Sequence, residues 1–377
     1  MKTALEVSYS YLTTQFAPTR DLSRAILKDI ETELSQCFFT LGPWVERFEN
    51  EFAQRHKVKH AVGTSNGTDA LQMALEAMEA GPGKNVITVA NTFVATVGAI
   101  VFTGATPRFV DVKDDYLMDM SHIAAPGIAD EHTSCVIPVD LTGCPVPVGR
   151  SAMGTHVSLK VLRDSCQAVG AEYRGQNVAS MGYASAFSLH PLKNLNVWGD
   201  GGIVTTDNDE IADRVRLLRN HGLRDRDTVE IVGRNARLDS IQAIVGFHAM
   251  KELDWINEQR RLHAKWYDEG LRGIPGIIVP SRDPDALPVY HTYVIMVDDR
   301  AKFQAYLNEW GIETKIHYPV PIHLQPGYAF LGYKKGDLPK TEYQAEHILS
   351  LPIHQYLSNE QQSHVIETIR EWGRHHS

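Results

Sequence analysis

Apolar residues near the start of the chain recur at the spacing of amphipathic helices. Four of them predict a helix that begins at Asp21, namely Leu22, Ile26, Ile30 and Leu34. A glycine and a proline at positions 42–43 end this helix and open a second one, which runs to about residue 55. Residues 1–20 show no clear period, and we expect an irregular arm that packs on the body of the protein.

From residue 59 onward, short apolar runs alternate with helical segments. A strand, a turn of small residues and a helix are predicted over residues 59–78, and another helix over 94–102. Further strands are predicted at residues 85–90, 107–112, 135–141 and 157–163. This βαβ rhythm predicts an α/β fold, with a mainly parallel sheet covered by helices and ligands at the carboxyl ends of its strands. The run at 202–207 is typical of an antiparallel edge strand.

The pattern changes in the last third of the chain. A helix is predicted from Asp209 to Arg219, and a long helix that bridges two domains runs from Asp239 past Trp255 to Leu262. A strand at 290–297, a helix at 300–310 and a strand at 313–317 follow, which indicates an α+β unit. We therefore expect a large domain over residues 1–255 and a small C-terminal domain over residues 256–377.

Composition and charge narrow the classes of function. The net charge of −9 argues against a nucleic-acid partner, because such binding needs a basic face. The N-terminus lacks the apolar core of a signal peptide and no run of about 18 apolar residues occurs, so we expect a protein that is neither secreted nor membrane-spanning. Four cysteines without metal-binding spacing predict reduced thiols, a cytoplasmic location and no metal site: Cys37, Cys135, Cys144 and Cys166.

One lysine stands in an unusual place. Lys193 follows His190-Pro191 and precedes the glycine-rich turn at 199–202, so it lies in a turn and not on a helix. A lysine with a lowered pKa in a closed pocket can form a Schiff base with an aldehyde, as it does in enzymes that use pyridoxal 5′-phosphate (PLP). The alternative is a solvated lysine on a surface loop.

Other positions supply what PLP chemistry needs besides an amine. Asp164 offers a carboxylate for the pyridine nitrogen, and Phe93 offers an aromatic face for the ring. Gly67 and Thr68, at the N-terminus of a predicted helix, form an anion site together with Ser188. Each residue also has a simpler explanation: a strand-end aspartate, a core aromatic, or a plain capping turn with Thr68 or Ser65 as the N-cap.

The chain resembles the DegT/StrS family of PLP-dependent nucleotide-sugar aminotransferases, which have the fold type I of aspartate aminotransferase. The resemblance covers nearly the whole chain and rests on these motifs: Asn66-Gly-Thr-Asp-Ala-Leu71, Thr92-Phe-Val-Ala-Thr96, Gly104-Ala-Thr-Pro107, Phe109-Val-Asp111, Asp164-Ser-Cys-Gln-Ala168, Ser188-x-His-x-x-Lys-Asn194, Gly199-Asp-Gly-Gly202 and Asn235-Ala-Arg-Leu-Asp239.

The resemblance implies a role for each candidate residue. Lys193 carries the cofactor, Asp164 faces the pyridine nitrogen, and Gln167 lies beside the phenolic oxygen. Phe93 lies against the ring, while Ser188, Gly67 and Thr68 hold the phosphate. Asn235 matches an asparagine that reaches the phosphate of the neighbouring subunit, which implies a homodimer with shared active sites.

The substrate is indicated by a turn near the C-terminus. The segment from Ile316 to Pro326 resembles the His-Tyr-Pro turn of family members that aminate C3 of a dTDP- or UDP-linked keto-sugar, and we expect L-glutamate as the amino donor. His317, Tyr318 and His323 are candidate hydrogen-bonding groups for the sugar, although each could be a structural group instead.

Three positions depart from the family pattern, namely Asp140, Thr142 and Leu189. These departures leave open how the chain contacts its substrate. The alternatives to an aminotransferase are a PLP-dependent sugar dehydratase or deoxygenase and a PLP-binding regulator without turnover. Lys193 argues against the dehydratase, and the lack of a basic DNA-binding segment argues against the regulator.

Overall fold

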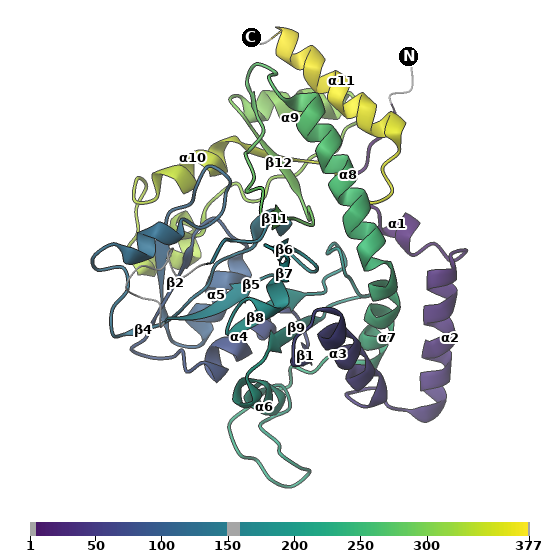
Figure 1. Cartoon of the computed structure of the whole chain (residues 1–377), viewed down its shortest axis with the longest axis vertical. Coiled ribbons are helices and arrows are strands. Elements are labelled where there is room, and N and C mark those ends of the chain that lie inside the picture. Colours follow the sequence, from purple (N-terminus) through teal and green to yellow (C-terminus); the bar gives the residue numbers. More distant parts are fainter. Residues whose placement is uncertain (1–4, 149–158, 376–377) are drawn as a thin grey trace.

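A seven-stranded sheet forms the centre of the larger part of the protein (Figure 1). The structure is a computed structural model that describes residues 5–148 and 159–375. The strands lie in the spatial order β1 (His60–Thr64), β9 (Gly202–Thr206), β8 (Ala184–Ser188), β5 (Lys160–Asp164), β4 (Thr133–Val136), β2 (Asn85–Val89) and β3 (Thr106–Val110).

Neighbouring strands from β8 to β3 all pair in parallel, which confirms the predicted α/β class. β9 is antiparallel as predicted, but the expectation that it lies at the edge is wrong. The run at 60–64 pairs with the outer side of β9 and becomes the edge strand itself. Of the strand predicted at 157–163, the first two residues lie outside the described part of the chain.

Helices cover both faces of the sheet. The strand β8 has apolar side chains on both of its faces, so both need cover. Ala184 and Ala186 pack against one layer of helices, and Phe187 packs against the other. One layer contains α4 (Gly67–Ala77), α5 (Val94–Phe102) and α6 (Asp209–Leu218), and the other contains α2 (Asp21–Gln36), α3 (Pro43–Arg55) and α7 (Ser240–Ala249). The small side chains of β8 let α4 pack closely on the sheet.

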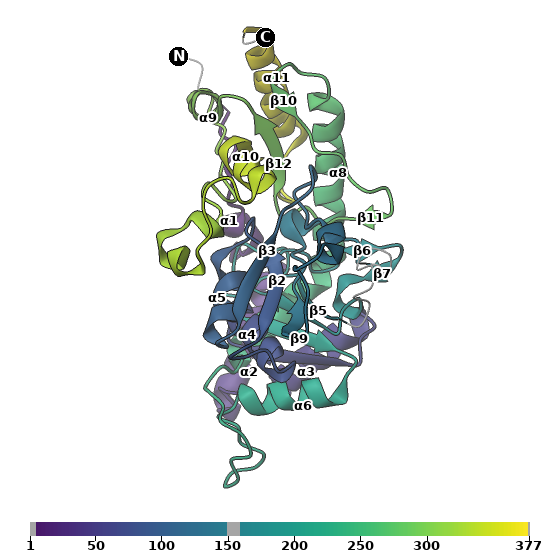
Figure 2. The same cartoon turned by 90° about the vertical axis from the view of Figure 1, so that its left-hand side faces the viewer.

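The C-terminal part forms an α+β unit above the sheet (Figure 2), as predicted. It contains a three-stranded antiparallel sheet of β10 (Ile277–Ile278), β12 (Tyr293–Val297) and β13 (Ile348–Leu351), with α9 (Arg300–Glu309), α10 (Pro339–His347) and α11 (Asn359–His375). The bridging helix is broken by the short helix η5 (Met250–Glu252), and its second half, α8 (Leu253–Leu271), rises beside α11 (Figure 1). The domain boundary at residue 255 stays a prediction and falls within the first turn of α8.

The strand predicted at 313–317 is wrong. These residues form no continuous strand pairing. Lys315 forms a single isolated bridge with Ser350, and Ile312, just before the segment, forms one with Val7. β13 takes the place beside β12, because its four residues are all buried and extend the apolar surface of β12. The N-terminal arm is irregular as expected, apart from one helical turn, α1 (Leu12–Gln15), and Val7 is fully buried.

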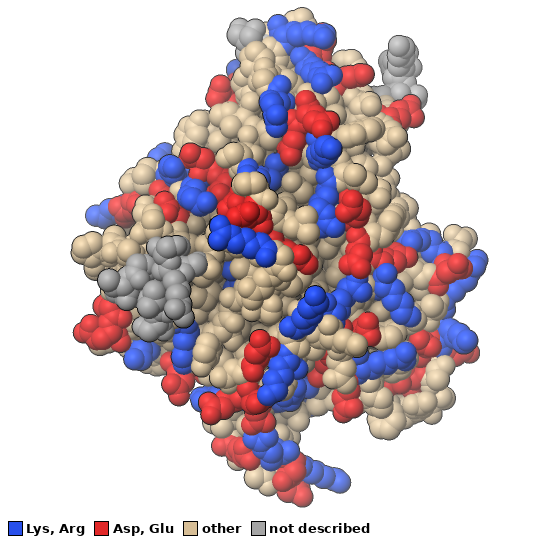
Figure 3. Space-filling model, in the orientation of Figure 1, with Lys and Arg blue, Asp and Glu red and all other residues tan. Residues whose placement is uncertain are grey.

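Short elements complete the described chain. They are a small sheet of β11 (Ala286–Leu287), β6 (Glu172–Tyr173) and β7 (Gln176–Asn177), and the 3-10 helices η1 (Met120–Ala124), η2 (Leu141–Gly143), η4 (Val178–Ser180), η6 (Ile322–Leu324) and η7 (Pro326–Leu331). Basic and acidic side chains are mixed over the face drawn in Figure 3, with no continuous basic area. None of the described helices is long and apolar enough to cross a bilayer.

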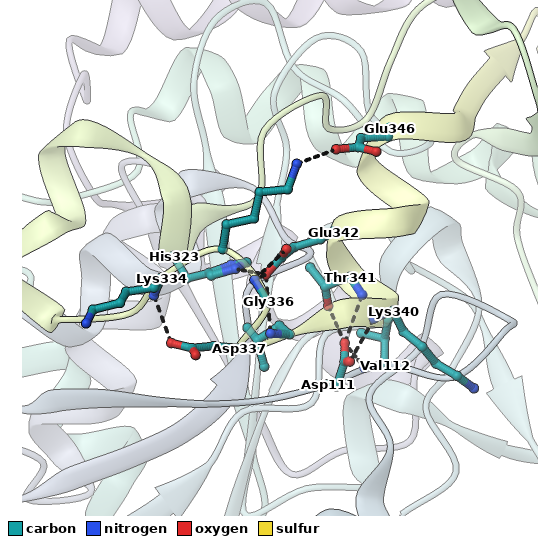
Figure 4. Close-up of polar contacts among 12 residues, drawn as sticks. Asp111, Val112, His323, Lys334, Gly336, Asp337, Lys340, Thr341, Glu342 and Glu346 are labelled. Atoms are coloured by element: carbon teal, nitrogen blue, oxygen red, sulfur yellow. Dashed lines mark hydrogen bonds and ion pairs between the residues drawn. The ribbon is translucent and has the colours of Figure 1, made fainter.

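Asp111, directly after β3, joins the two parts of the protein (Figure 4). Its Oδ1 accepts hydrogen bonds from the backbone N–H and the hydroxyl of Thr341, at 2.9 and 2.7 Å. Its Oδ2 accepts the N–H of Lys340 at 2.9 Å. Asp111 thus caps the N-terminus of α10 from another part of the chain, which favours its negative charge and fixes the C-terminal unit on the sheet.

Candidate active site

One cavity of about 330 Å³ gathers nearly all of the candidate residues at the carboxyl ends of the parallel strands. Its lining includes every residue expected to bind the cofactor within one chain, and two of the three expected to bind substrate: Gly67, Thr68, Phe93, Asp164, Gln167, Ser188, Lys193, His317 and Tyr318. The position agrees with the rule that ligands of α/β sheets bind at this edge.

Lys193 lies in the turn that the glycine and proline punctuation predicted. Its backbone N–H donates to the carbonyl of His190 at 2.8 Å, and Val197 closes the loop by donating to Leu189 at 2.9 Å. Burial lowers the pKa of the Lys193 ammonium, and the nearby Cys166 and Asp164 oppose that shift only in part. A larger fraction of this amine is therefore neutral, and nucleophilic, than of a lysine in water.

Asp164, the last residue of β5, is a buried carboxylate in the same cavity. Its Oδ2 accepts a hydrogen bond from the Thr96 hydroxyl at 2.6 Å, and its Oδ1 accepts the N–H of Cys166 at 3.1 Å. Burial raises the pKa of Asp164 overall, and these two donors together with Lys193 oppose that shift only in part. The carboxylate is thus held in one orientation by groups that favour its charged form.

The N-terminus of α4 forms the anion side of the cavity. Asn66 is the N-cap and accepts the N–H of Asp69 at 2.8 Å, so the alternative explanation, with Thr68 or Ser65 as the cap, is wrong. A Cβ on Gly67 would lie 2.8 Å from Cβ of Ser188 and 3.1 Å from Sγ of Cys166. Only glycine lets this helix end approach Ser188 so closely, and the free amides beside a hydroxyl suit a phosphate.

Gln167, Tyr318 and Phe93 form a connected wall. Oε1 of Gln167 accepts the backbone N–H of Thr142 at 2.7 Å, and its Nε2 donates to the Tyr318 hydroxyl at 3.3 Å. The ring of Tyr318 lies 5.7 Å from that of Phe93, measured between centroids. Phe93 is 53% exposed, which does not fit a core aromatic but fits a ring that faces a ligand.

Two histidines of the cavity stay neutral near pH 7. Burial lowers the pKa of His317 to about 4, with the charge of Lys193 as the next cause, and its Nδ1 lies 2.8 Å from the hydroxyl of Ser350. Burial also lowers the pKa of His291 well below its usual value. Nδ1 of His291 is buried and has no hydrogen-bond partner among the described residues. Neutral imidazoles can both donate and accept hydrogen bonds, which suits a hydroxylated substrate.

Two candidate residues lie outside the cavity. His323 is buried under α10, where its Nε2 lies 2.9 Å from Oε1 of Glu342, and Glu342 also accepts the N–H of Gly336 at 2.8 Å (Figure 4). His323 is thus bonded to Glu342 through Nε2, while its buried Nδ1 has no hydrogen-bond partner among the described residues, and the structure does not bring it to the substrate side. Asn235 is exposed and pairs with Asn220 at the base of a hairpin, away from the cavity of its own chain.

The structure adds residues that the sequence reasoning missed. His291 lines the cavity, and Thr96 with Thr92 forms a hydroxyl chain to Asp164, with 2.6 Å between the two Oγ1 atoms. Thr96 lies in the first turn of α5, whereas Thr92 precedes the N-cap Phe93, so helix periodicity alone did not place the two hydroxyls together. His291 carried no signal of its own, because it lies in an irregular segment just before β12.

The three departures from the family pattern have structural explanations. Asp140 is fully buried and accepts hydrogen bonds from Arg163 and from the Ser165 hydroxyl, so it does not face the cavity. Leu189 belongs to the core below the Lys193 turn. Thr142 donates its backbone N–H to Gln167, and this hydrogen bond does not depend on which side chain stands at position 142.

This set of groups fits PLP. A buried amine with a lowered pKa faces a buried carboxylate that is held by two donors. A helix N-terminus and a hydroxyl, brought together at a position where only glycine fits, form the anion site. The cavity therefore contains an amine for the aldehyde, a partner for the pyridinium and donors for the phosphate.

Comparisons with known proteins agree with this arrangement. The model of the DegT/DnrJ/EryC1/StrS aminotransferase family matches residues 20–370. The chain is 40% identical over 337 residues to a dTDP-3-amino-3,4,6-trideoxy-alpha-D-glucose transaminase of Streptomyces venezuelae, covering 89% of this chain and 88% of that protein. It is also 38% identical to a "pleiotropic regulatory protein" of Geobacillus stearothermophilus, covering 94% and 96%. The crystal structure of S. venezuelae DesV superposes with a TM-score of 0.91, 37% identity and 98% coverage of both chains.

Proposed function

We propose that this chain, which belongs to the DegT/DnrJ/EryC1/StrS aminotransferase family and depends on PLP, transfers an amino group from L-glutamate to a keto group of a nucleotide-linked deoxy-sugar. The observation that carries the proposal is the pair of Lys193 and Asp164 in one cavity, with the N-terminus of α4 beside them.

The residues of the cavity would hold the cofactor at three points. Lys193 would bind its aldehyde, Asp164 would pair with its pyridine nitrogen, and the amides of Gly67 and Thr68 with the Ser188 hydroxyl would bind its phosphate. Gln167 would interact with its phenolic oxygen, and Phe93 would pack against its ring. Bound PLP supplies an electron sink that stabilises negative charge on the carbon next to the amine.

Lys193 moves the protons of the reaction. When the amino group of glutamate displaces it, Nζ is free to take the proton from the α-carbon of glutamate, and its lowered pKa leaves it neutral often enough to act as a base. The same amine would then pass that proton to the cofactor, which keeps the nitrogen while 2-oxoglutarate leaves. With the keto-sugar the steps would run in reverse, and Lys193 would deliver a proton to the sugar carbon that receives the nitrogen. Thr96 and the N–H of Cys166 hold the Asp164 carboxylate in place by donating to it, and they oppose the effect of burial, which raises its pKa.

The substrate side is proposed from the C-terminal unit. His317 and Tyr318 line the cavity opposite the sheet, and His291 lies next to them. These neutral donors and acceptors fit the hydroxyl groups of a sugar ring. The transaminase from S. venezuelae is named for a dTDP-3-amino sugar, which supports amination at C3 and a dTDP- or UDP-linked substrate here.

The experiment that tests the function uses the purified protein with glutamate that carries an isotopic label on its amino nitrogen. Each 3-keto and 4-keto sugar, linked to dTDP or to UDP, is incubated with the labelled donor, and the product is read by mass spectrometry. We expect the label in the sugar, with the 3-keto substrates preferred, and none when Lys193 is replaced by alanine. A labelled product from the 4-keto sugars alone would contradict the C3 assignment.

The same assay separates the alternatives. A dehydratase or deoxygenase would give a sugar without label and with one oxygen fewer. A PLP-binding regulator, which the name of the G. stearothermophilus relative brings into consideration, would bind the cofactor and label no sugar. Either result would contradict the aminotransferase proposal.

We also propose that the enzyme is a cytoplasmic homodimer with shared sites. The segment after α6 extends as a long hairpin away from the sheet (Figure 1), with Asn220 and Asn235 paired at its base. Its Val232 is 94% exposed and Val229 is 63% exposed. Exposed apolar side chains on a projecting hairpin favour a protein partner, and a second copy of the chain could receive Asn235 at its phosphate site.

Subunit mixing tests this proposal. We expect a mixture of Lys193→Ala and Asn235→Ala subunits to be more active than either parent, because each heterodimer then has one intact site and one doubly damaged site. Random exchange gives up to about one quarter of the wild-type activity. Native mass spectrometry confirms the exchange. If exchanged subunits stay as inactive as their parents, Asn235 serves its own chain and the shared-site proposal fails.

A further inference from the structure

The N-terminal arm makes a direct hydrogen bond to the backbone of Lys193. The hydroxyl of Tyr11 donates to the carbonyl oxygen of Lys193 at 3.0 Å and lies 3.3 Å from that of Leu192. Tyr11 is only 5% exposed. Since the position of a side chain depends on its own backbone, this contact fixes the point from which the reactive amine extends into the cavity.

A second residue of the arm holds the other side of the same turn. Gln15 and Asn196 are fully buried and exchange two hydrogen bonds through their side-chain amides, at 3.0 and 2.9 Å. Asn196 also donates to the carbonyl of Pro191. Tyr11 and Gln15 therefore contact the chain before, at and after Lys193, from an element more than 170 residues away in the sequence.

Tyr11 itself is held in place by α8. The guanidinium of Arg260 lies 5.1 Å from the centroid of the Tyr11 ring, and Arg260 is 1% exposed. Its Nη1 donates to the carbonyls of Tyr290 at 3.0 Å, His291 at 3.3 Å and Ile353 at 3.1 Å. The ring of Tyr11 thus lies between the Lys193 turn and a buried cation that also fixes the backbone of His291, a residue of the cavity wall.

α8 reaches the Lys193 turn a second time through Asn257. The side-chain amide of Asn194 donates to Oδ1 of Asn257 at 2.9 Å and to the carbonyl of Val289 at 2.9 Å. The turn is thus held between the arm on one side and α8 on the other. An arm that only covered apolar surface would need the ring of Tyr11 but not its hydroxyl. Here the hydroxyl donates to the backbone carbonyl of Lys193, which is the one lysine among the described residues that line the cavity.

We propose that Tyr11 is a positioning residue for Lys193, with Gln15 as its support, so that the N-terminal arm is part of the catalytic apparatus and not only a cover of the core. The proposal rests on the role proposed above for Lys193. Loss of the Tyr11 hydroxyl leaves the ring packed under Arg260 but removes the hydrogen bond at the carbonyl of Lys193, while the bonds of Asn194 and Asn196 elsewhere in the turn remain. The amine then spends less time where it can attack and transfer protons, while the substrate contacts of His317 and Tyr318 stay intact.

The test compares Tyr11→Phe with Tyr267→Phe in the PLP-loaded enzyme. Tyr267 is an equally buried tyrosine whose hydroxyl donates to the carbonyl of Pro352 at 2.8 Å, outside the cavity lining, so its variant loses a bond of the same kind elsewhere. Both variants should show similar, small decreases in Tm. Only Tyr11→Phe should show a roughly tenfold lower kcat, with the KM values for glutamate and keto-sugar nearly unchanged.

A spectroscopic measurement separates positioning from stability. Hydroxylamine removes PLP from its lysine, and the loss of the cofactor's absorption band gives the rate. We expect this rate to rise several-fold in Tyr11→Phe, and to rise less in Gln15→Met, which keeps the Tyr11 bond. It should stay at the wild-type value in Tyr267→Phe.

Two results would overturn the inference. Tyr11→Phe could match Tyr267→Phe in kcat and in hydroxylamine rate, or it could raise KM with kcat unchanged, which would indicate a role in substrate binding. Failure of the proposed function looks different: borohydride reduction of the wild-type enzyme, followed by peptide mapping, would then find PLP on a lysine other than Lys193.

Discussion

Replacing Lys193 by alanine should lower kcat by at least about a thousandfold, because the enzyme loses both the covalent attachment of its cofactor and the amine that moves protons. The structure supplies the reason for the size of this effect. Among the described residues that line the cavity, no other lysine is present to take over, and the neighbouring histidines have pKa values lowered by burial and by Lys193 itself. The measurement is the transfer of labelled nitrogen from glutamate to the keto-sugar.

A matched variant removes a lysine elsewhere. Lys335 is exposed and paired with Glu346, at 3.2 Å, so Lys335→Ala should keep the wild-type kcat. Borohydride reduction followed by peptide mapping should attach the cofactor to the peptide that contains Lys193 in both the wild type and this control. A Lys193→Ala enzyme that still transferred nitrogen at a tenth of the normal rate would rule out the assigned role.

The second large effect is expected at Asp164. Asp164→Asn should still bind PLP, since the lysine and the phosphate site are unchanged, but its kcat should fall by at least about a hundredfold. A neutral amide cannot stabilise a protonated pyridine, and without that proton the ring is a poor electron sink. The new amide would also meet Thr96, whose hydroxyl now donates to the carboxylate at 2.6 Å and would have to reorient.

The control for Asp164→Asn is another aspartate at the end of a strand. Asp207 follows β9, accepts the N–H of Lys59 at 2.8 Å and is exposed. Asp207→Asn should leave both PLP binding and turnover unchanged. Cofactor binding is measured by absorbance after dialysis, and turnover by the labelled-nitrogen assay. Normal turnover in an Asp164→Asn enzyme that is shown to be fully loaded with PLP would remove Asp164 from the mechanism.

Several elements followed from the sequence because their causes are local. The helix α5 and the strand β2 have hydrophobic runs bounded by turn residues, and both were predicted to within a residue. The glycine-rich segment after Lys193 cannot continue a helix, which placed that lysine in a turn. The βαβ order then put Gly67, Phe93 and Asp164 at the same edge of a parallel sheet, because right-handed crossovers leave little choice.

Contacts between distant segments were beyond such reasoning. Nothing local distinguishes β9 as an inner strand, because only the pairing of β1 on its outer side decides that. The run at 313–317 has the composition of a strand, yet β13, thirty or more residues later, takes the place beside β12. The sequence also left open which polar residue, Ser65, Asn66 or Thr68, caps the N-terminus of α4. The backbone conformation makes Asn66 the cap.

The candidate site divides in the same way. The sequence by itself determined the fold class and the chemically reactive groups, since residue type and motif spacing decide what a lysine, an aspartate and a helix N-terminus can do. Only the tertiary structure decided which polar residues accompany them. It brought His291 into the cavity and left His323 bonded to Glu342, and it placed Tyr11 against the carbonyl of Lys193. The physical reason is that burial and hydrogen bonding between segments far apart in sequence depend on how the two parts of the chain pack, which no local pattern encodes.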